Sequence, residues 1–142
     1  MAISILDSLV YDRTQADADA KNHKGSYNYA DLNRVGEVVA YIRDMFLAYG
    51  YRITASPRLG WTEEDIPRRS DMDLYLRNIR SLGGLIVFDK NPPVLPMQMD
   101  GLTWQTANNI EQFLSLLGVA AEQIPDSWVE LGQAESGATY ER

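Results

Sequence analysis

His23 is the only histidine of the chain, and histidine is the side chain most often used for general acid–base catalysis. It lies in the polar stretch KNHKGS. A Ser-His-Asp triad would also need a nucleophile and an orienting carboxylate, and the spacing of the sequence identifies neither. A metal site built on two or three histidines is excluded within one chain. We therefore interpret His23 as an exposed loop residue.

Short clusters of carboxylates are the second feature that could do chemistry: Asp17 with Asp19, residues 63–65, and Asp71 with Asp73. The first cluster lacks the glycine and the distal glutamate of a calcium loop. The second precedes a predicted helix, where the helix macrodipole favours negative charge. The third pair, two residues apart on a predicted helix, does not share a face. We predict no metal site, while a glycosidase pair across a cleft is neither favoured nor excluded.

The chain contains no cysteine, which excludes disulfides, thiolate zinc sites, iron–sulfur clusters and cysteine nucleophiles. Its glycines form neither a G-x-G-x-x-G turn nor the G-x-x-x-x-G-K phosphate loop. Nucleotide binding therefore has no support in the sequence. We predict a protein without enzymatic activity, catalytic residues or cofactor.

Composition indicates a folded domain rather than a disordered chain. The 142 residues are 45% hydrophobic and 23% charged, and this length suits a single domain over residues 1–142. The formal net charge is −7 and the pI is about 4.6, which does not suit nucleic-acid binding. No apolar run is long enough to cross a membrane, and residues 1–10 lack the basic start of a signal peptide.

The charge is unevenly distributed along the chain. Residues 1–60 hold seven basic and seven acidic side chains, whereas residues 61–142 hold six and thirteen. The second half therefore carries the whole net charge. It is either a solvated acidic face or a docking surface for a basic partner.

Three segments show the alternating spacing of three and four that marks the apolar face of a helix. We expect helices at 30–49, 68–82 and 103–123. Gly50 suits the end of the first helix, Pro67 the first turn of the second, and Thr103 the N-cap of the third. The predicted apolar faces comprise Leu32, Val35, Val39, Ile42, Phe46 and Tyr49; Met72, Tyr75, Leu76, Ile79 and Leu82; and Trp104, Ala107, Ile110, Phe113, Leu114, Leu116, Leu117, Ala121 and Ile124.

The remaining segments are expected to connect or flank these helices. Residues 1–28 form an N-terminal arm with a short helix that begins near Thr14, and residues 52–56 alternate like a short strand. The pattern of 85–88 fits a helix or a strand. The three prolines within 91–99 indicate an extended crossover between two helices. Residues 128–142 form a hairpin or a frayed end.

The fold class that follows is mainly α: a small antiparallel bundle of three main helices with short peripheral strands or a hairpin. Gly36, inside the first predicted helix, is expected to permit the close approach of a neighbouring helix. Aromatic side chains near the helix ends serve either as packing or as an interface, because tyrosine and tryptophan are enriched at interfaces. The interface candidates, expected to be exposed, are Tyr27, Tyr29, Tyr49, Tyr51, Trp61 and Trp128.

Three stretches of the sequence stand out together: LVYDRTQAD at 9–17, KGSYNYADLNRVG at 24–36 followed by VVAYIRDMF, and WTEEDIP at 61–67 with DGLTWQTANNIEQFL at 100–114. In this order they resemble small structural proteins and modules encoded in the tail genes of phages and prophages of gut bacteria. The join around His23 is shorter than in many of these proteins. The residues after Trp128 also lack the ending rich in Gly and Glu of that group.

The resemblance implies a non-enzymatic component of the virion, in the tail, baseplate or fibre, made in the cytoplasm of the host bacterium. Its expected partners are other virion tail proteins or further copies of itself. Neither nucleic-acid binding nor membrane insertion is expected. The alternative is an adhesion module that recognises a receptor or glycan through exposed Trp and Tyr side chains.

Overall fold

The structure, a computed structural model, describes residues 4–125 and is built from helices. A 3₁₀ helix η1 (Ile5–Ser8) and the short helix α1 (Gln15–Ala20) form the N-terminal arm. The three main helices are α2 (Tyr29–Ala48), α3 (Arg69–Gly83) and α4 (Trp104–Glu122). The mainly helical class is confirmed, and no strand occurs in the described part of the chain. The hairpin expected at 128–142 lies outside it.

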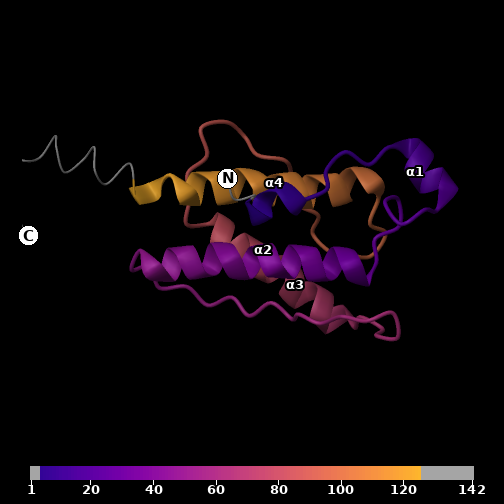
Figure 1. Cartoon of the computed structure of the whole chain (residues 1–142), viewed down its shortest axis with the longest axis horizontal. Coiled ribbons are helices and arrows are strands. Elements are labelled where there is room, and N and C mark those ends of the chain that lie inside the picture. Colours follow the sequence, from indigo (N-terminus) through magenta and orange to yellow (C-terminus); the bar gives the residue numbers. More distant parts are fainter. Residues whose placement is uncertain (1–3, 126–142) are drawn as a thin grey trace, which may run out of the picture.

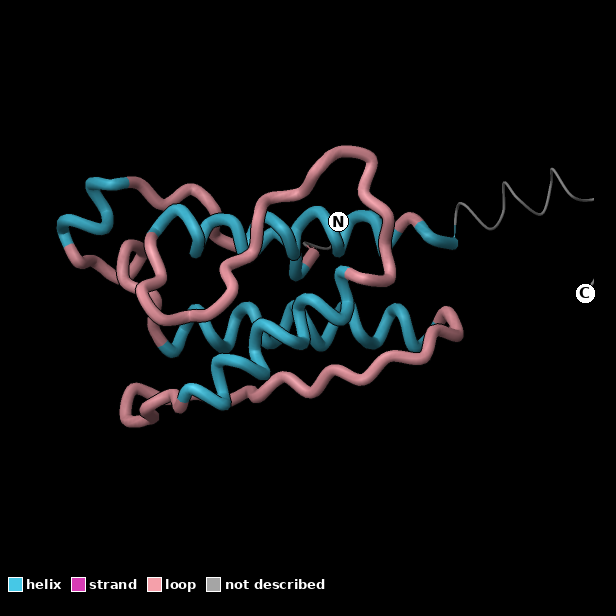
Figure 2. The backbone as a smooth tube through the Cα atoms, turned by 180° about the vertical axis from the view of Figure 1, so that it is seen from behind, coloured by secondary structure: helices cyan, strands magenta, loops and turns pink. Residues whose placement is uncertain are grey.

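The three main helices run in the same direction rather than antiparallel (Figures 1 and 2). Near the start of α2, Arg34 binds Glu111 of α4, and further along α2 Tyr41 donates a hydrogen bond to Glu122. Positions on the two helices therefore increase together. The expected antiparallel order is wrong because the connections are long enough to return to the starting end. They span residues 49–68 and 84–103.

The predicted strand at 52–56 is instead part of the first extended return segment, 49–68. Ile53 and Ala55 pack toward the core while the residues between them are exposed, which explains the alternating pattern. Its polar backbone groups bind side chains rather than a second strand. Asn78 accepts from Ser56 N–H and Arg43 donates to the Ala55 carbonyl.

The second return segment, 84–103, arches over α4 (Figure 2). The extended crossover predicted for 91–99 is confirmed, and residues 85–88 form neither helix nor strand. Leu95 is buried, Asn109 donates to the Val94 carbonyl, and Arg80 donates to the Pro96 carbonyl at 2.5 Å. These contacts fix an otherwise irregular backbone.

The predicted apolar faces meet in one core. It contains Val35, Ile42 and Phe46 of α2 together with buried residues of the other helices, namely Leu76, Ile79, Leu82, Ile110, Phe113, Leu114, Leu117 and Ala121. Leu116 does not widen the face of α4 as expected, because its side chain is exposed. Three glycines permit close approaches in the core, and one of them, Gly83 of α3, faces Phe113 of α4. The other two involve the arm and a return segment. Gly118 faces Leu6 of η1, and Gly36 faces Arg58 and Leu59 rather than another helix.

Most of the N-caps predicted from the sequence are confirmed. Thr14 and Asp17 form the capping box of α1, and Thr103 caps α4. Pro67 lies just outside α3 rather than in its first turn. Within the described residues, no helix combines the length and apolar content needed to cross a membrane.

Leu114→Ala is expected to lower the free energy of unfolding by about 2–5 kcal/mol, because the leucine is fully buried and the substitution leaves a cavity. Urea denaturation measures the loss. The matched control is Leu116→Ala on the exposed side of the same helix, for which a change of less than about 0.5 kcal/mol is expected. Equal losses for the two variants would contradict the packing described.

Candidate functional site

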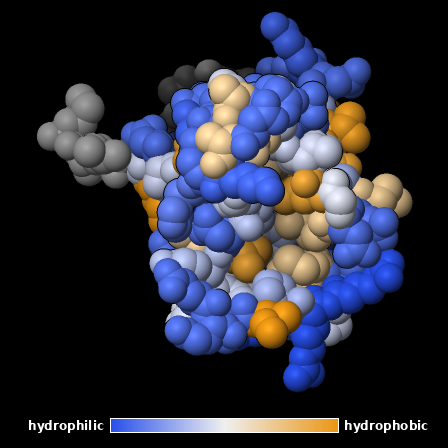
Figure 3. All heavy atoms as spheres, turned by 90° about the vertical axis from the view of Figure 1, so that its right-hand side faces the viewer, coloured by the Kyte–Doolittle hydropathy of each residue, from blue (hydrophilic) through white to orange (hydrophobic). Residues whose placement is uncertain are grey.

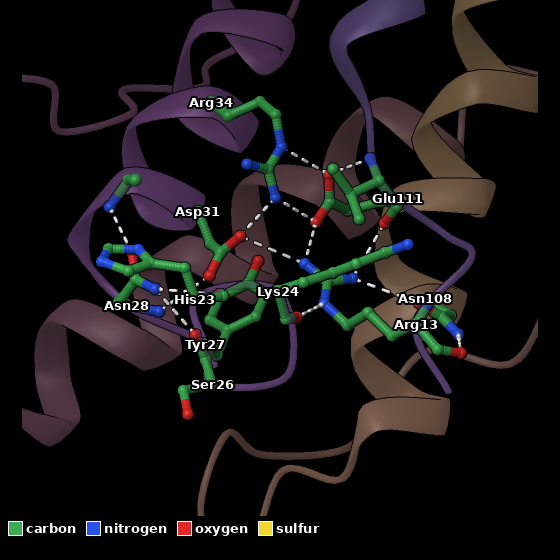
Figure 4. Close-up of polar contacts among 12 residues, drawn as sticks. Arg13, His23, Lys24, Ser26, Tyr27, Asn28, Asp31, Arg34, Asn108 and Glu111 are labelled. Atoms are coloured by element: carbon green, nitrogen blue, oxygen red, sulfur yellow. Dashed lines mark hydrogen bonds and ion pairs between the residues drawn. The ribbon is translucent and has the colours of Figure 1, made fainter. Parts of the chain in front are cut away.

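A buried cluster of charged side chains joins the N-terminal arm to α2 and α4 (Figure 4). At its centre lies Arg13, in the chain between η1 and α1. One terminal nitrogen, Nη2, donates to Glu111 Oε2 at 2.6 Å and to Asp31 Oδ1 at 3.1 Å. The other nitrogens donate to the carbonyls of Val10 and Lys24 and to Asn108 Oδ1. All five N–H donors of this guanidinium thus have acceptors.

Arg34 completes the cluster from the second turn of α2. Its Nε and Nη2 donate to the two carboxylate oxygens of Glu111, at 2.8 and 2.6 Å, and Nη2 also pairs with Asp31. Burial alone would lower the pKa of Arg34, but its hydrogen bonds and ion pairs with Glu111 and Asp31 outweigh burial and raise that pKa. Two guanidinium groups thus balance two carboxylates, and we call these four residues the charge cluster.

Helix geometry places the two carboxylates. Asp31 is the third residue of α2, where it also accepts the Asn28 N–H at 2.8 Å and so caps the helix. Glu111 faces α2 from α4 and accepts the Val10 N–H as well, so its fully buried carboxylate has four donors. Buried charges persist only when they are paired and hydrogen-bonded in this way.

Tyr27 extends the charge cluster toward α3. Its ring lies 5.4 Å from the Arg13 guanidinium carbon, and its hydroxyl hydrogen-bonds that of Tyr75. Burial and the nearby charge of Glu111 raise the pKa of Tyr27, and burial together with Tyr27 raises that of Tyr75. The arm and all three main helices therefore meet at one point.

Sequence reasoning did not identify this cluster, although its members lie in the stretches that carry the phage resemblance. Arg13 lies in LVYDRTQAD, Asp31 and Arg34 in KGSYNYADLNRVG, and Glu111 in DGLTWQTANNIEQFL. One signal was present. Glu111 is four residues after Ala107 and three before Leu114, so a charged residue occupies the apolar face of the third predicted helix.

An open groove of about 840 Å³ lies beside the cluster, at the end of the molecule where α2, α3 and α4 begin. Figure 3 looks onto this end, where hydrophobic patches lie in a hollow rimmed by hydrophilic side chains. Residues 21–29, 61–67 and 99–102 contribute its walls, and Leu32 and Met72 contribute apolar surface. We refer to it as the end groove.

Three of the predicted interface residues, Tyr27, Tyr29 and Trp61, meet at the end groove, where the two tyrosines are partly buried rather than exposed. Trp61 is only 5% exposed, so its expected exposure is wrong. Asn33 binds the Trp61 backbone, and the Arg58 guanidinium carbon lies 3.7 Å from the ring centroid. This stacking and the bonds to Asn33 draw the indole inward.

Tyr49 and Tyr51 lie at the opposite end of α2, about 30 Å from the groove for a helix of this length. The Tyr51 ring packs against Phe46 with centroids 5.0 Å apart. Both tyrosines are partly buried rather than exposed. The tyrosines near α2 therefore form two separate groups, and Trp128 lies outside the described residues.

The remaining polar residues singled out in the sequence are His23 and the acidic clusters. His23 is exposed at the rim of the end groove. One aspartate of each acidic cluster accepts a hydrogen bond from the backbone N–H group three residues earlier; these are Asp17, Asp65 and Asp71. Each of them therefore has a structural role at a turn or helix start. Among the described residues, no three potential metal ligands lie together. The groove offers aromatic rings, amides and apolar surface, and this chemistry suits noncovalent recognition.

Arg13→Met is expected to reduce the free energy of unfolding by about 3–5 kcal/mol, because it leaves two buried carboxylates, Asp31 and Glu111, with Arg34 as their single guanidinium partner. Lys24→Met is the matched control: it removes a solvent-exposed ion pair with Asp12 in the same arm and should cost no more than about 1 kcal/mol. Urea denaturation compares them. A similar loss in both variants would show that the charge cluster contributes no special stability.

Stability is expected to fall in alkali, because burial and hydrogen bonding favour the protonated phenols in the folded state. The hydrogen bond to Glu122 raises the pKa of Tyr41 to about 12 from its ordinary 10.0. The contribution of Tyr41 to the free energy of unfolding is therefore complete below pH 10 and is lost as the pH rises toward 12 and the phenol ionises in the folded state. Urea denaturation along this range should show a shallower decline for Tyr41→Phe than for the native chain. Tyr11→Phe, at an exposed position, serves as the control, and an unchanged decline in Tyr41→Phe would contradict the assignment.

The sequence matches no family model, and neither the curated proteins nor the solved structures contain a match to this chain.

Proposed function

We propose that this protein is a non-enzymatic structural component of a phage particle, in the tail, baseplate or fibre. It acts by packing against copies of itself or against other virion proteins. The sequence resemblance supplies the phage context for this proposal. The observation that carries the packing role is the unusual exposure of large apolar side chains on a well-anchored backbone.

The four most exposed large apolar side chains of the described residues all lie in the return segments. They are Val87, Met97, Ile66 and Val94, at 96, 88, 85 and 77% exposure. Arg80 donates a hydrogen bond to the carbonyl of Pro96, the residue before Met97. Asn109 donates to the carbonyl of Val94 itself. Val94 and Met97 are thus presented from a backbone held by hydrogen bonds, so a partner would meet a surface there that requires little ordering.

Burial of such a side chain contributes about 1.5–3 kcal/mol relative to leaving it in water. Four of them represent a substantial contact energy that the isolated chain does not use. Each subunit of a symmetric assembly needs contact surfaces of this kind toward its neighbours. The return segments, which exist because the helices are parallel, provide them.

The end groove favours a second candidate, an adhesion module for a receptor or glycan. Its volume of about 840 Å³ falls in the range of small-ligand sites. Tyr27 and Tyr29 offer ring surfaces, and Asn22 and Asn28 offer amide groups at the same groove. Aromatic faces with hydrogen-bonding groups nearby suit the apolar faces and hydroxyls of a sugar.

The chain is expected among the proteins that mass spectrometry detects in purified particles, and tagged protein should capture co-expressed tail proteins from its own gene neighbourhood. Val87→Ser with Met97→Ser should abolish this capture by removing apolar contact surface. Asn91→Ser, an exposed polar position in the same segment, is the control.

Absence of the chain from particles would contradict the proposal, as would capture that the double variant leaves unchanged. Glycan-array binding that is lost in Tyr29→Ala, without any capture of tail proteins, would favour the adhesion module instead.

A further inference from the structure

The outer face of α4 differs in charge from the outer faces of the other main helices. The exposed residues of α4 are Gln105, Gln112, Leu116, Val119 and Glu122, and only the last is charged. Glu122 already accepts a hydrogen bond from Tyr41 of α2. By contrast, the exposed face of α2 carries the acidic residues Glu37 and Asp44, and that of α3 carries charges of both signs, at Arg69, Asp73, Arg77 and Arg80.

Leu116 and Val119 form the apolar centre of this face, with exposures of 43 and 44%. They are three residues apart and therefore adjacent on the helix surface. Gln112 lies four residues before Leu116, and Gln123 follows Val119 by four and is also exposed. The order along the face is therefore amide, apolar, apolar, amide, with the spacing of a helix–helix seam.

This order is unchanged when the helix is reversed, a property that suits pairing with an identical helix. Consider a two-fold axis that is perpendicular to α4 and passes between Leu116 and Val119. It would place Leu116 of each copy against Val119 of the other copy. The two uncharged amide positions would then meet at either end. A two-fold interface requires such self-complementarity, because the same patch serves both partners.

Net charge also favours this face for a second copy. Each chain carries −7, so two copies repel each other, and a contact face with few charges adds little to that repulsion. The outer face of α4 carries one charged side chain, Glu122 near its end, and so permits contact. The acidic residues Asp7 and Asp12 lie at its flank, in a cleft that they share with Val119. Exposed apolar side chains flank it too, with Tyr11 in that cleft and Val94 beside Asn109.

We propose that two copies of this chain pair antiparallel through the outer faces of α4, centred on Leu116 and Val119. The inference rests on the proposed function and names a second copy as one partner. One helix face is smaller than a standard interface of about 1,600 Å², so the pairing is weak and depends on concentration. Repeated placement of copies in a particle would raise their effective concentration.

Sedimentation equilibrium of the full chain tests the pairing. The mass is expected to rise from 16.0 kDa toward twice that value with concentration, and added salt should strengthen association by screening the repulsion between copies. Leu116→Lys should return the mass to that of one chain. Leu47→Lys, at 47% exposure on α2, adds the same charge elsewhere and should leave association intact.

A second variant tests the antiparallel geometry. In Leu116→Lys combined with Val119→Glu, the introduced ammonium and carboxylate groups face each other across the pair, so association should return. Failure to return would overturn the antiparallel arrangement. A native chain that remains monomeric at every concentration, or that pairs equally well as Leu116→Lys, would overturn the inference.

The outcomes separate this inference from the proposed function. Capture of tail proteins by a chain that stays monomeric would overturn the pairing and leave the virion role intact. Pairing of a chain that is absent from particles would overturn only the virion role.

Discussion

The fold depends on the complete satisfaction of the charges of Arg13, Asp31, Arg34 and Glu111 inside the molecule. Desolvation of such groups is costly, and their attraction compensates only where the geometry is good. Glu111 has four hydrogen-bond donors and Arg13 has five acceptors, so an axial shift of α4 against α2 would break several bonds at once. The apolar core permits many similar packings, whereas the charge cluster selects one register and one position of the arm.

The sequence predicts the helices and their buried faces well, because periodicity reports directly which side of a helix avoids water. It does not predict direction, because an apolar face reads the same in either orientation. Residues 52–56 illustrate a related limit: alternation marks an extended chain with one side buried, and a strand also requires a neighbour. The sequence predicts an exposed Trp61, because its stacking partner Arg58 and its hydrogen-bonding partner Asn33 cannot be identified from spacing alone. The charge cluster is not predictable for the same reason, since Arg13 and Glu111 are 98 residues apart.

The parallel arrangement also explains how the surface is organised. The starts of three helices, each with a partial positive charge, lie at one end of the molecule. Asp31 and Asp71 occupy the first turns of two of them, and Asp65 and Asp100 stand at the groove nearby. Asp65 and Asp71, members of two of the acidic clusters considered as metal ligands in the sequence, thus lie at a place where helix dipoles favour negative charge. The return segments, in turn, contribute Ala55 and Leu95 to the core and carry other apolar side chains on the outside of the bundle.

The same arrangement affects how the chain reaches its folded state. In an antiparallel bundle, neighbouring helices dock as soon as a short loop closes, but here each docking step must first close a segment of about twenty residues. Contacts between distant parts of the sequence generally slow folding, so this protein belongs kinetically with topologies richer in long-range contacts than its helix content suggests. During synthesis, Arg13, Asp31 and Arg34 leave the ribosome long before Glu111. The charge cluster therefore cannot form until α4, which carries the Glu111 carboxylate, has been synthesised.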